Sequence, residues 1–208
     1  MKQAVNMVLF LTTKNIQMKL VLASSSPFRK ALLEKLHLDF ECDSPDIDET
    51  PKANESIENM VKRLSESKAQ ALAKSHPNAL IIGSDQSASL HGNVLHKPGN
   101  FETAFEQLKA ASGETITFYT GLCLLNTQTQ HIETICEPYV VKFRPLDNTE
   151  IENYLNRERP FNCAGSFKSE ALGISLFDSM QGDDPNTLIG LPLIKLCRML
   201  KEQGMPVI

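Results

Sequence analysis

The stretch 19–30 constrains the fold most, because it predicts a strand, a turn and a helix in direct succession. Its first part, 19–23, is a short and mostly apolar run, which is typical of a buried strand. Pro27 cannot continue a strand interior but suits the first position of a helix, and Ser26 before it is a good N-cap. Apolar residues then recur at helical spacing over 28–36. We therefore expect a strand, a serine turn and a helix in that order.

The serine turn 24–26 has the features of an anion-binding site. A helix N-terminus presents free N–H groups and the positive end of the helix dipole. The hydroxyls of Ser24 and Ser26 add donors, while Arg29 and Lys30 add positive charge in the first helical turn. Cations there oppose the dipole, so an anion between them would relieve a local cost. The alternative interpretation is an ordinary capped helix with an exposed basic pair.

The composition indicates an ordinary globular protein. Its 208 residues fit one domain or one two-lobed domain, and 41% hydrophobic content is enough for a sizeable core. A net charge of −4 argues against a nucleic-acid surface but leaves room for a local basic pocket. The five cysteines are scattered without a C-x-x-C pair, so we expect reduced thiols in the cytoplasm rather than a zinc site or disulfides. No stretch is long enough to span a membrane.

Residues 1–17 are expected to be a dispensable extension of a single domain, 18–208. The apolar run 7–11 is too short for a typical signal peptide, and no small-residue cleavage site follows it. The first predicted strand begins at Lys19, directly after Met18. We therefore expect Met18 to be a natural start of the chain.

The rest of the chain mixes strands and helices without strict alternation, which predicts an α/β or α+β fold with a mixed sheet. The expected strands are 38–42, 79–84, a small hairpin at 87–95, and an antiparallel pair at 114–127 and 131–144. The expected helices are 56–76, 101–112, 147–159 and 190–203, and 161–178 is expected to be irregular. The strand 79–84 is expected to end at Asp85 and Gln86.

Several polar and charged residues follow predicted strands or lie in loops rich in glycine and proline. They are the serine turn to Arg29, Asp48-Glu49, Asp85-Gln86, Lys97 and 166–170, joined by Lys68 near the apolar side of a long helix. This combination suits a metal-assisted reaction on a polyphosphate. Cations and a divalent metal neutralise the phosphates, and a carboxylate holds the metal or accepts a proton from water.

Each of these residues also has a purely structural interpretation. Asp85 could cap a turn, although an acid after a very apolar strand is placed as active-site residues often are in open α/β sheets. Asp48-Glu49 could be a solvated loop. Lys68 could extend to solvent along its helix, and Lys97 could be an ordinary turn residue. The histidines form no spaced pair and the cysteines have no histidine partner, so no role is expected for them.

Taken together, these motifs resemble the Maf family of nucleotide pyrophosphatases. The family's opening motif resembles 22–29, Leu-Ala-Ser-Ser-Ser-Pro-Phe-Arg, and further motifs match in the same order: Asp48-Glu49, Lys68-Ala69, Gly83-Ser84-Asp85, Lys97-Pro98 and Ala164-Gly165. The resemblance extends from Met18 to the C-terminus. It implies an elongated α/β fold like that of the inosine triphosphatases, with a cleft between two lobes. It also implies hydrolysis of a nucleoside triphosphate to the monophosphate and diphosphate in the cytoplasm, by a family in which homodimers are common.

The resemblance further implies a role for each matched residue. Asp85 would be the general base that accepts a proton from the attacking water. Glu49 and Asp85 would hold a divalent metal, Mg, Mn or Co. The triphosphate would be bound by the serine turn and the cations, namely Ser24, Ser26, Arg29, Lys68 and Lys97.

Three positions separate the branches of the family. The branch that acts on dTTP and UTP has arginine, threonine and glutamine where this chain has Phe28, Gln86 and Glu170, which resemble the branch that prefers 7-methyl-GTP. N7-methylation gives guanine a positive charge, which an aromatic face attracts and an arginine repels. A carboxylate can also accept hydrogen bonds from the base. We expect a house-cleaning 7-methyl-GTP pyrophosphatase; the alternatives are a dTTP/UTP pyrophosphatase or a non-catalytic nucleotide-binding regulator of cell division.

Overall fold

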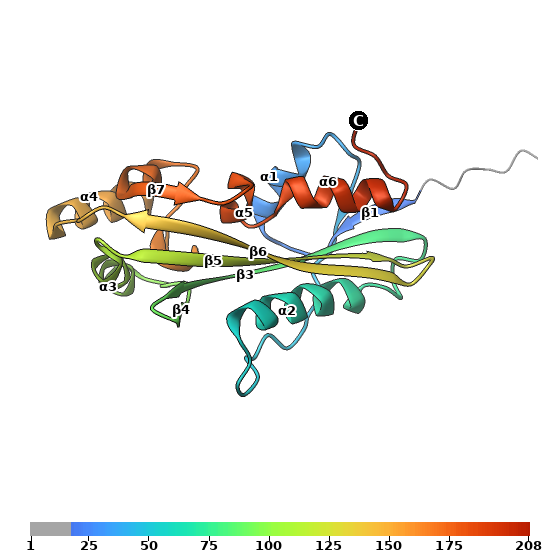
Figure 1. The fold of residues 1–208 in the computed structure, drawn as a ribbon, viewed down its shortest axis with the longest axis horizontal. Coiled ribbons are helices and arrows are strands. Elements are labelled where there is room, and N and C mark those ends of the chain that lie inside the picture. The colour runs from blue at the N-terminus through green and yellow to red at the C-terminus, as the bar shows by residue number, and fades with distance from the viewer. Residues whose placement is uncertain (1–17) are drawn as a thin grey trace, which may run out of the picture.

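The computed structural model describes residues 18–208, so the prediction that 1–17 are dispensable lies outside the described residues. The described chain forms one seven-stranded sheet with helices on both faces, and Figure 1 shows that the molecule is elongated along this sheet. The strands are β1 Lys19–Leu22, β2 Glu41–Cys42, β3 Ala79–Leu90, β4 Asn93–Leu95, β5 Thr115–Asn126, β6 His131–Phe143 and β7 Phe177–Gln181. The helices are α1 Pro27–Glu34, α2 Ile57–Ala71, α3 Phe101–Ala111, α4 Asn148–Glu158, α5 Pro185–Ile189 and α6 Leu193–Glu202.

The sheet is mixed, as the sequence predicts. Its order is β2-β1-β3-β5-β6-β7, with β4 paired to β3. The pairs β1–β2 and β1–β3 are parallel, and the remaining pairs are antiparallel. The mixed α/β fold is therefore confirmed.

The prediction that the third strand ends at Asp85 is wrong. β3 continues to Leu90, because it pairs with β5 without interruption from Leu80 to Leu90. Two short elements, β7 and α5, lie where the sequence predicts irregular chain or gives no element, and α2 ends at Ala71 rather than 76. The longer β3 and the additional β7 arise because pairing with a long neighbouring strand can impose strand structure on residues of weak intrinsic preference.

One edge of β3 is unpaired in its middle. β1 pairs with its first part, Ala79–Ile82, and β4 pairs with its last part, Ala88–Leu90. Between them, 83–87 has a strand neighbour only on the β5 side within the described chain. The sheet therefore has an opening along this edge, directly beyond the end of β1 and the serine turn.

Two glycines allow α2 to lie unusually close to the sheet. A Cβ on Gly83 would come within 1.9 Å of the Ser65 carbonyl oxygen, and one on Gly121 within 2.3 Å of the Val61 carbonyl oxygen. These backbone groups belong to α2, which covers one face of the sheet, while α1 and α6 lie on the other (Figure 1). The close approach fixes the height of α2 over β3.

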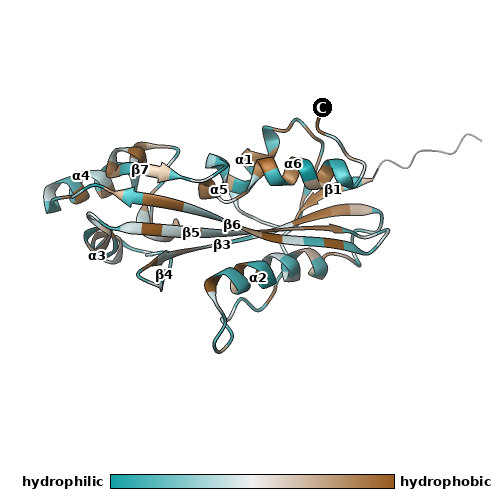
Figure 2. Ribbon diagram, in the orientation of Figure 1, coloured by the Kyte–Doolittle hydropathy of each residue, from teal (hydrophilic) through white to brown (hydrophobic). Residues whose placement is uncertain are grey.

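The apolar core forms three clusters, one under α2 around Ala69 and Ile81 and two at opposite ends of the sheet. At one end, α1 and α6 pack on β1, β3 and β5, with Leu33, Leu80 and Leu196 fully buried. At the other end, α3 and α4 pack around Phe118 and Phe143. Figure 2 shows apolar residues along the strands and mostly hydrophilic residues on the visible side of α2. The long strands β3, β5 and β6 run through both ends of the sheet. Within 18–208, no helix combines the length and apolarity needed to cross a membrane.

Candidate active site

A cleft of about 1110 Å³ lies at the opening beside β3. Every residue that the sequence predicts for the site lines it: Ser24, Ser26, Phe28, Arg29, Glu49, Lys68, Asp85, Gln86, Lys97 and Glu170. Because successive side chains on a strand point to opposite faces, Asp85 faces α2 while Gln86 faces α5. The missing strand neighbour lets both faces of β3 contribute to one cleft.

An ion triad stands on the α2 side of the cleft. The Lys68 ammonium contacts Asp85 Oδ1 at 2.7 Å and Glu49 Oε1 at 2.8 Å. The Lys68 and Asp85 side chains are 12% and 14% exposed, whereas Glu49 is 58% exposed. Lys68 lies one helical turn beyond Ser65, and Asp85 lies two residues beyond Gly83 on the same face of β3. The glycine contact therefore brings the buried pair together.

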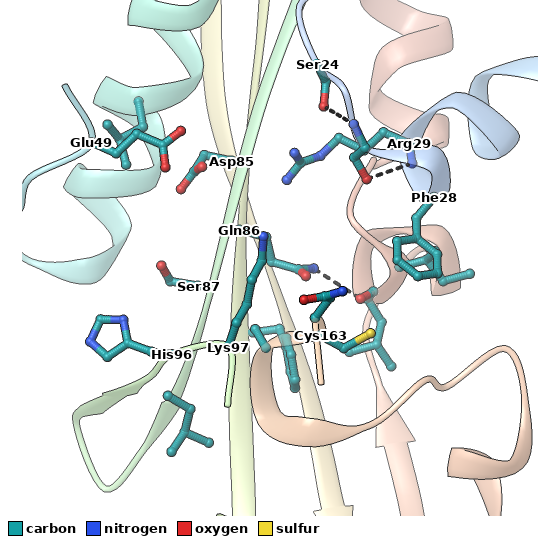
Figure 3. Close-up of a pocket in the computed structure, with 18 of the residues that line it drawn as sticks. Ser24, Phe28, Arg29, Glu49, Asp85, Gln86, Ser87, His96, Lys97 and Cys163 are labelled. Atoms are coloured by element: carbon teal, nitrogen blue, oxygen red, sulfur yellow. Dashed lines mark hydrogen bonds between the residues drawn. The ribbon is translucent and has the colours of Figure 1, made fainter. Parts of the chain in front are cut away.

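Arg29 faces this triad from α1 (Figure 3). Its Nε donates to the Gly190 carbonyl at 2.9 Å, and Ser84 Oγ donates to the same oxygen at 3.0 Å. Gly190 has φ of 126°, a conformation that favours glycine. Burial lowers the pKa of the Arg29 guanidinium, and the charges of Asp85 and Glu49 oppose that shift. The two terminal nitrogens of Arg29 have no hydrogen-bond partner among the described residues, so they remain available to a ligand.

The serine turn is built as predicted. Ser26 Oγ caps α1 by accepting from the Arg29 N–H at 3.4 Å, and Ser24 Oγ accepts from the Ser26 N–H at 3.1 Å. Both hydroxyls therefore stabilise the turn through their oxygens. Their hydrogens are free to point to a ligand, so capping and anion binding are compatible.

The structure brings together the three residues predicted to select the base. Gln86 Nε2 donates to Thr120 Oγ1 and the Thr187 carbonyl, both at 2.9 Å, and to the Leu188 carbonyl at 3.1 Å. With its nitrogen occupied in this way, Gln86 offers a ligand only its carbonyl oxygen. Phe28 is half-buried and Glu170 is exposed at the cleft. The cleft therefore offers an aromatic face and two hydrogen-bond acceptors.

Lys97 enters the cleft from the loop after β4, and it makes no ion pair within 18–208. Gln107 on α3 links this loop to the segment around Ala164-Gly165. Its Nε2 donates to the His96 carbonyl at 2.9 Å, and its Oε1 accepts from Ser166 Oγ at 2.5 Å. Two motifs that are far apart in the sequence are thus held by one side chain.

Sequence reasoning missed Arg159, an exposed cation that lines the cleft and has no ion-pair partner in the described chain. It ends α4 in the left-handed conformation, with φ of 49°. The only signal in the sequence is its place before Pro160, which predicts a helix end but no direction for the side chain. Lys168, which lies in the candidate stretch 166–170, also lines the cleft and is held by Glu158 at 2.9 Å.

The residues present fit a divalent metal held jointly with phosphates. No cluster of three or more His, Cys, Asp or Glu side chains suited to a metal occurs in residues 18–208. Glu49 and Asp85, however, present two carboxylates to one cation, the Lys68 ammonium. Mg²⁺ is commonly bound by one or two carboxylates together with substrate phosphates and water, so this pair is a sufficient protein contribution.

The fold and the cleft define a class of mixed α/β protein that joins several cations and two carboxylates at a break in the sheet, an arrangement suited to a phosphorylated ligand. The chain belongs to the Maf family, since residues 19–203 match the sequence profile described as "Maf-like protein". It is 54% identical over 189 residues to "7-methyl-GTP pyrophosphatase" of Colwellia psychrerythraea, covering 91% of this chain and 94% of that one. It is 55% identical over 189 residues to the protein of the same name from Nitrosococcus oceani, covering 91% and 95%.

A crystal structure of "Nucleoside-triphosphatase / dITP/XTP pyrophosphatase" from Mycobacterium abscessus is also similar, at 16% identity and a TM-score of 0.38. The match covers 68% of this chain and 96% of that one. This likeness is too weak to support a conclusion about the present chain.

Proposed function

We propose that this protein is a pyrophosphatase that hydrolyses 7-methyl-GTP to 7-methyl-GMP and diphosphate. The observation that carries the proposal is the triad of Lys68 with Asp85 and Glu49 at the open edge of β3, faced by the unpaired donors of Arg29. Carboxylates for water and metal therefore stand beside cations for phosphate. Membership of the Maf family and the names of the two relatives support the same reaction.

In the proposed reaction, water adds across the anhydride bond between the α- and β-phosphorus atoms. Asp85 accepts the proton that the water loses, which is the ordinary role of a general base. The triphosphate is held by Arg29, Lys68 and Lys97 and by the hydroxyls of Ser24 and Ser26. These groups surround one cleft, which supports a shared ligand.

Glu49 and Asp85 would hold the divalent metal, which supplies charge neutralisation on the phosphates when it is bound. In this proposal, Lys68 gives up part of its contact with the carboxylates and turns to a phosphate oxygen. The identity of the metal, Mg, Mn or Co, is decided by activity with each. The family resemblance also supports a cytoplasmic homodimer that removes modified nucleotides.

The base is proposed to lie between Phe28 and the acceptors Gln86 and Glu170. The positive charge on 7-methylguanine favours both an aromatic face and a carboxylate. Gln86 supports this arrangement because its nitrogen is fixed to α5 and its oxygen is left as an acceptor. The ring donors of guanine match acceptors rather than donors.

The test is a hydrolysis screen with the full chain on 7-methyl-GTP, GTP, dTTP and UTP, with each metal and with chelator. The nucleoside monophosphate, inorganic diphosphate and inorganic phosphate are separated by chromatography. We expect inorganic diphosphate rather than phosphate as the product, and the highest kcat/KM on 7-methyl-GTP. A higher value on dTTP or UTP would move the protein to the other branch. Tight nucleotide binding without any turnover would replace the enzyme with a regulator.

A further inference from the structure

The loop 43–55 carries Glu49 to the cleft, yet it contains no helix or strand. Its Glu49 contact with Lys68 is a single ion pair, and the Glu49 side chain is more than half exposed. An exposed ion pair alone contributes little, since it must offset the entropy of ordering two long side chains. A second set of contacts is therefore needed to keep the Glu49 carboxylate in place.

That second set comes from Arg63 on α2. Arg63 Nε and Nη2 donate to the two oxygens of Glu55, each at 2.7 Å, and Nη2 also donates to the Thr50 carbonyl at 3.2 Å. The Arg63 and Glu55 side chains are only 20% and 11% exposed. Two parallel charge-assisted hydrogen bonds fix direction as well as distance, which a lysine cannot reproduce. The pairing holds the pKa of Glu55 at about 2, mainly through its hydrogen bonds with Arg63.

Thr50, the residue after Glu49, is held through both of its backbone polar groups. The Thr50 N–H donates to Asp48 Oδ1 at 2.9 Å, and the Thr50 carbonyl accepts from Arg63. Glu49 therefore lies between a turn closed by Asp48 and a carbonyl held by α2. Since α2 also carries Lys68, one helix fixes both the backbone beside Glu49 and the partner of its carboxylate.

We propose that Arg63 is a positioning residue for the reaction, which acts through Glu55 and Thr50 to set the place of the Glu49 carboxylate. Arg63 does not line the cleft, so in this proposal it acts on the reaction through other residues. This inference rests on the proposed role of Glu49 as a metal-holding carboxylate. It gives the otherwise irregular loop a defined function as a fixed arm of the active site.

A double-mutant cycle tests this role, with kcat/KM for 7-methyl-GTP measured in wild type, Arg63→Lys, Glu49→Gln and the double variant. Arg63→Lys keeps the positive charge but loses the pair of parallel hydrogen bonds to Glu55. We expect about a tenfold loss in kcat/KM, equal to ~1.4 kcal/mol. In the Glu49→Gln background the same change should alter kcat/KM less than twofold, because coupled residues are non-additive. Arg198→Lys is the matched control, since Arg198 on α6 forms a surface ion pair with Glu133 on β6.

Hydrogen–deuterium exchange gives a readout independent of activity. Arg63→Lys should raise deuterium uptake in loop 43–55, while Glu49→Gln and Arg198→Lys should leave most of it unchanged. Equal losses from Arg63→Lys in both backgrounds, or unchanged loop exchange, would overturn the positioning role and leave the proposed function intact. Wild-type activity in Glu49→Gln would overturn the role of Glu49 and this inference together.

Discussion

The two walls of the cleft are built in different ways. The wall formed by β3, α1 and α5 is locked by the backbone: Gly190 holds Arg29 and Ser84, and the α5 carbonyls hold Gln86. The opposite wall, loop 43–55, is held mainly by side chains of α2, namely Lys68 and Arg63. We therefore expect the first wall to keep its shape when a ligand binds. We expect the second to lose its geometry through one substitution that leaves the fold intact.

The difference is consistent with the roles proposed for the two carboxylates. Asp85 belongs to the fixed wall and is 14% exposed, whereas Glu49 belongs to the loop wall and is 58% exposed. A base must be within hydrogen-bond reach of one water, which favours the rigid position. A metal ligand can tolerate more movement, because phosphates and water complete the coordination.

The largest effect is expected at the fixed wall. Asp85→Asn keeps the shape of the side chain but removes its ability to accept a proton. Loss of a general base typically costs ~10²–10⁴-fold in rate. We expect kcat to fall by that factor while the circular dichroism spectrum stays native, and Glu49→Gln on the loop wall to cost less. Turnover within a few-fold of wild type in Asp85→Asn would show that the base assignment is wrong.

The next effect concerns selectivity for the base of the nucleotide. Phe28→Arg replaces an attractive ring with a like charge, and Glu170→Gln removes a carboxylate. A cation–π contact is worth roughly 0.5–2 kcal/mol and a charge-assisted hydrogen bond roughly 1.5–3 kcal/mol. Together the two substitutions should lower kcat/KM for 7-methyl-GTP by about one to three powers of ten. The kcat/KM for dTTP or UTP should stay unchanged or rise.

Phe28→Leu is the control for this selectivity, because it keeps the apolar volume but removes the ring face. We expect it to reduce the preference for 7-methyl-GTP over GTP, which lacks the ring charge. Equal losses on every substrate in these variants would assign Phe28 and Glu170 to the fold or the phosphates. The pyrophosphatase proposal would not be affected.

The sequence predicts the two walls unequally. In the fixed wall, α1 and the first part of β3 follow from apolar periodicity and from Ser26 and Pro27, whereas α5 does not. All ten predicted site residues line the cleft. Single residues such as Asp85 carry a signal because of the strand before them. The resemblance to the Maf family supplied the rest of the site.

The sequence could not predict contacts that depend on register or on single side chains in space. The continuation of β3 to Leu90 follows from its pairing with β5, which no local pattern reveals. The fork from Arg63 to Glu55 joins residues whose separation in the sequence gives no preference for that pair. Arg159 lines the cleft from the left-handed end of α4, a conformation that no local pattern in the sequence predicts.

A third prediction tests the glycine contact that sets α2 against the fixed wall. In Gly83→Ala the new Cβ would meet the Ser65 carbonyl at 1.9 Å, so α2 must move. Overpacking of this kind costs typically ~1–3 kcal/mol, and the Lys68–Asp85 contact should lengthen with loss of activity. Urea unfolding and kcat measure the two effects. Gly204→Ala, with φ of +80° and open space around it, is the control that should lose stability alone.

The smallest effect is expected from the pH dependence of the loop wall. The pKa of Glu55 is lowered from 4.5 to about 2 by its hydrogen bonds with Arg63. The unfolded chain therefore binds more protons than the folded chain between these values, so stability rises with pH through that range. The contribution is fully present above about pH 4.5 and is lost as pH falls towards about 2.

Glu55→Gln isolates this contribution, because it keeps the size of the side chain and removes its titration. We expect the difference in urea midpoint between wild type and Glu55→Gln to be constant from neutral pH down to about pH 4.5 and to shrink below it. Glu58→Gln, which removes an exposed pair with Lys62 on the same helix, should show little difference at any pH. If the Glu55→Gln difference does not shrink in acid, the Arg63–Glu55 ion pair is not what holds the loop. The contrast between a wall fixed by the backbone and a wall fixed by side chains would then need another basis.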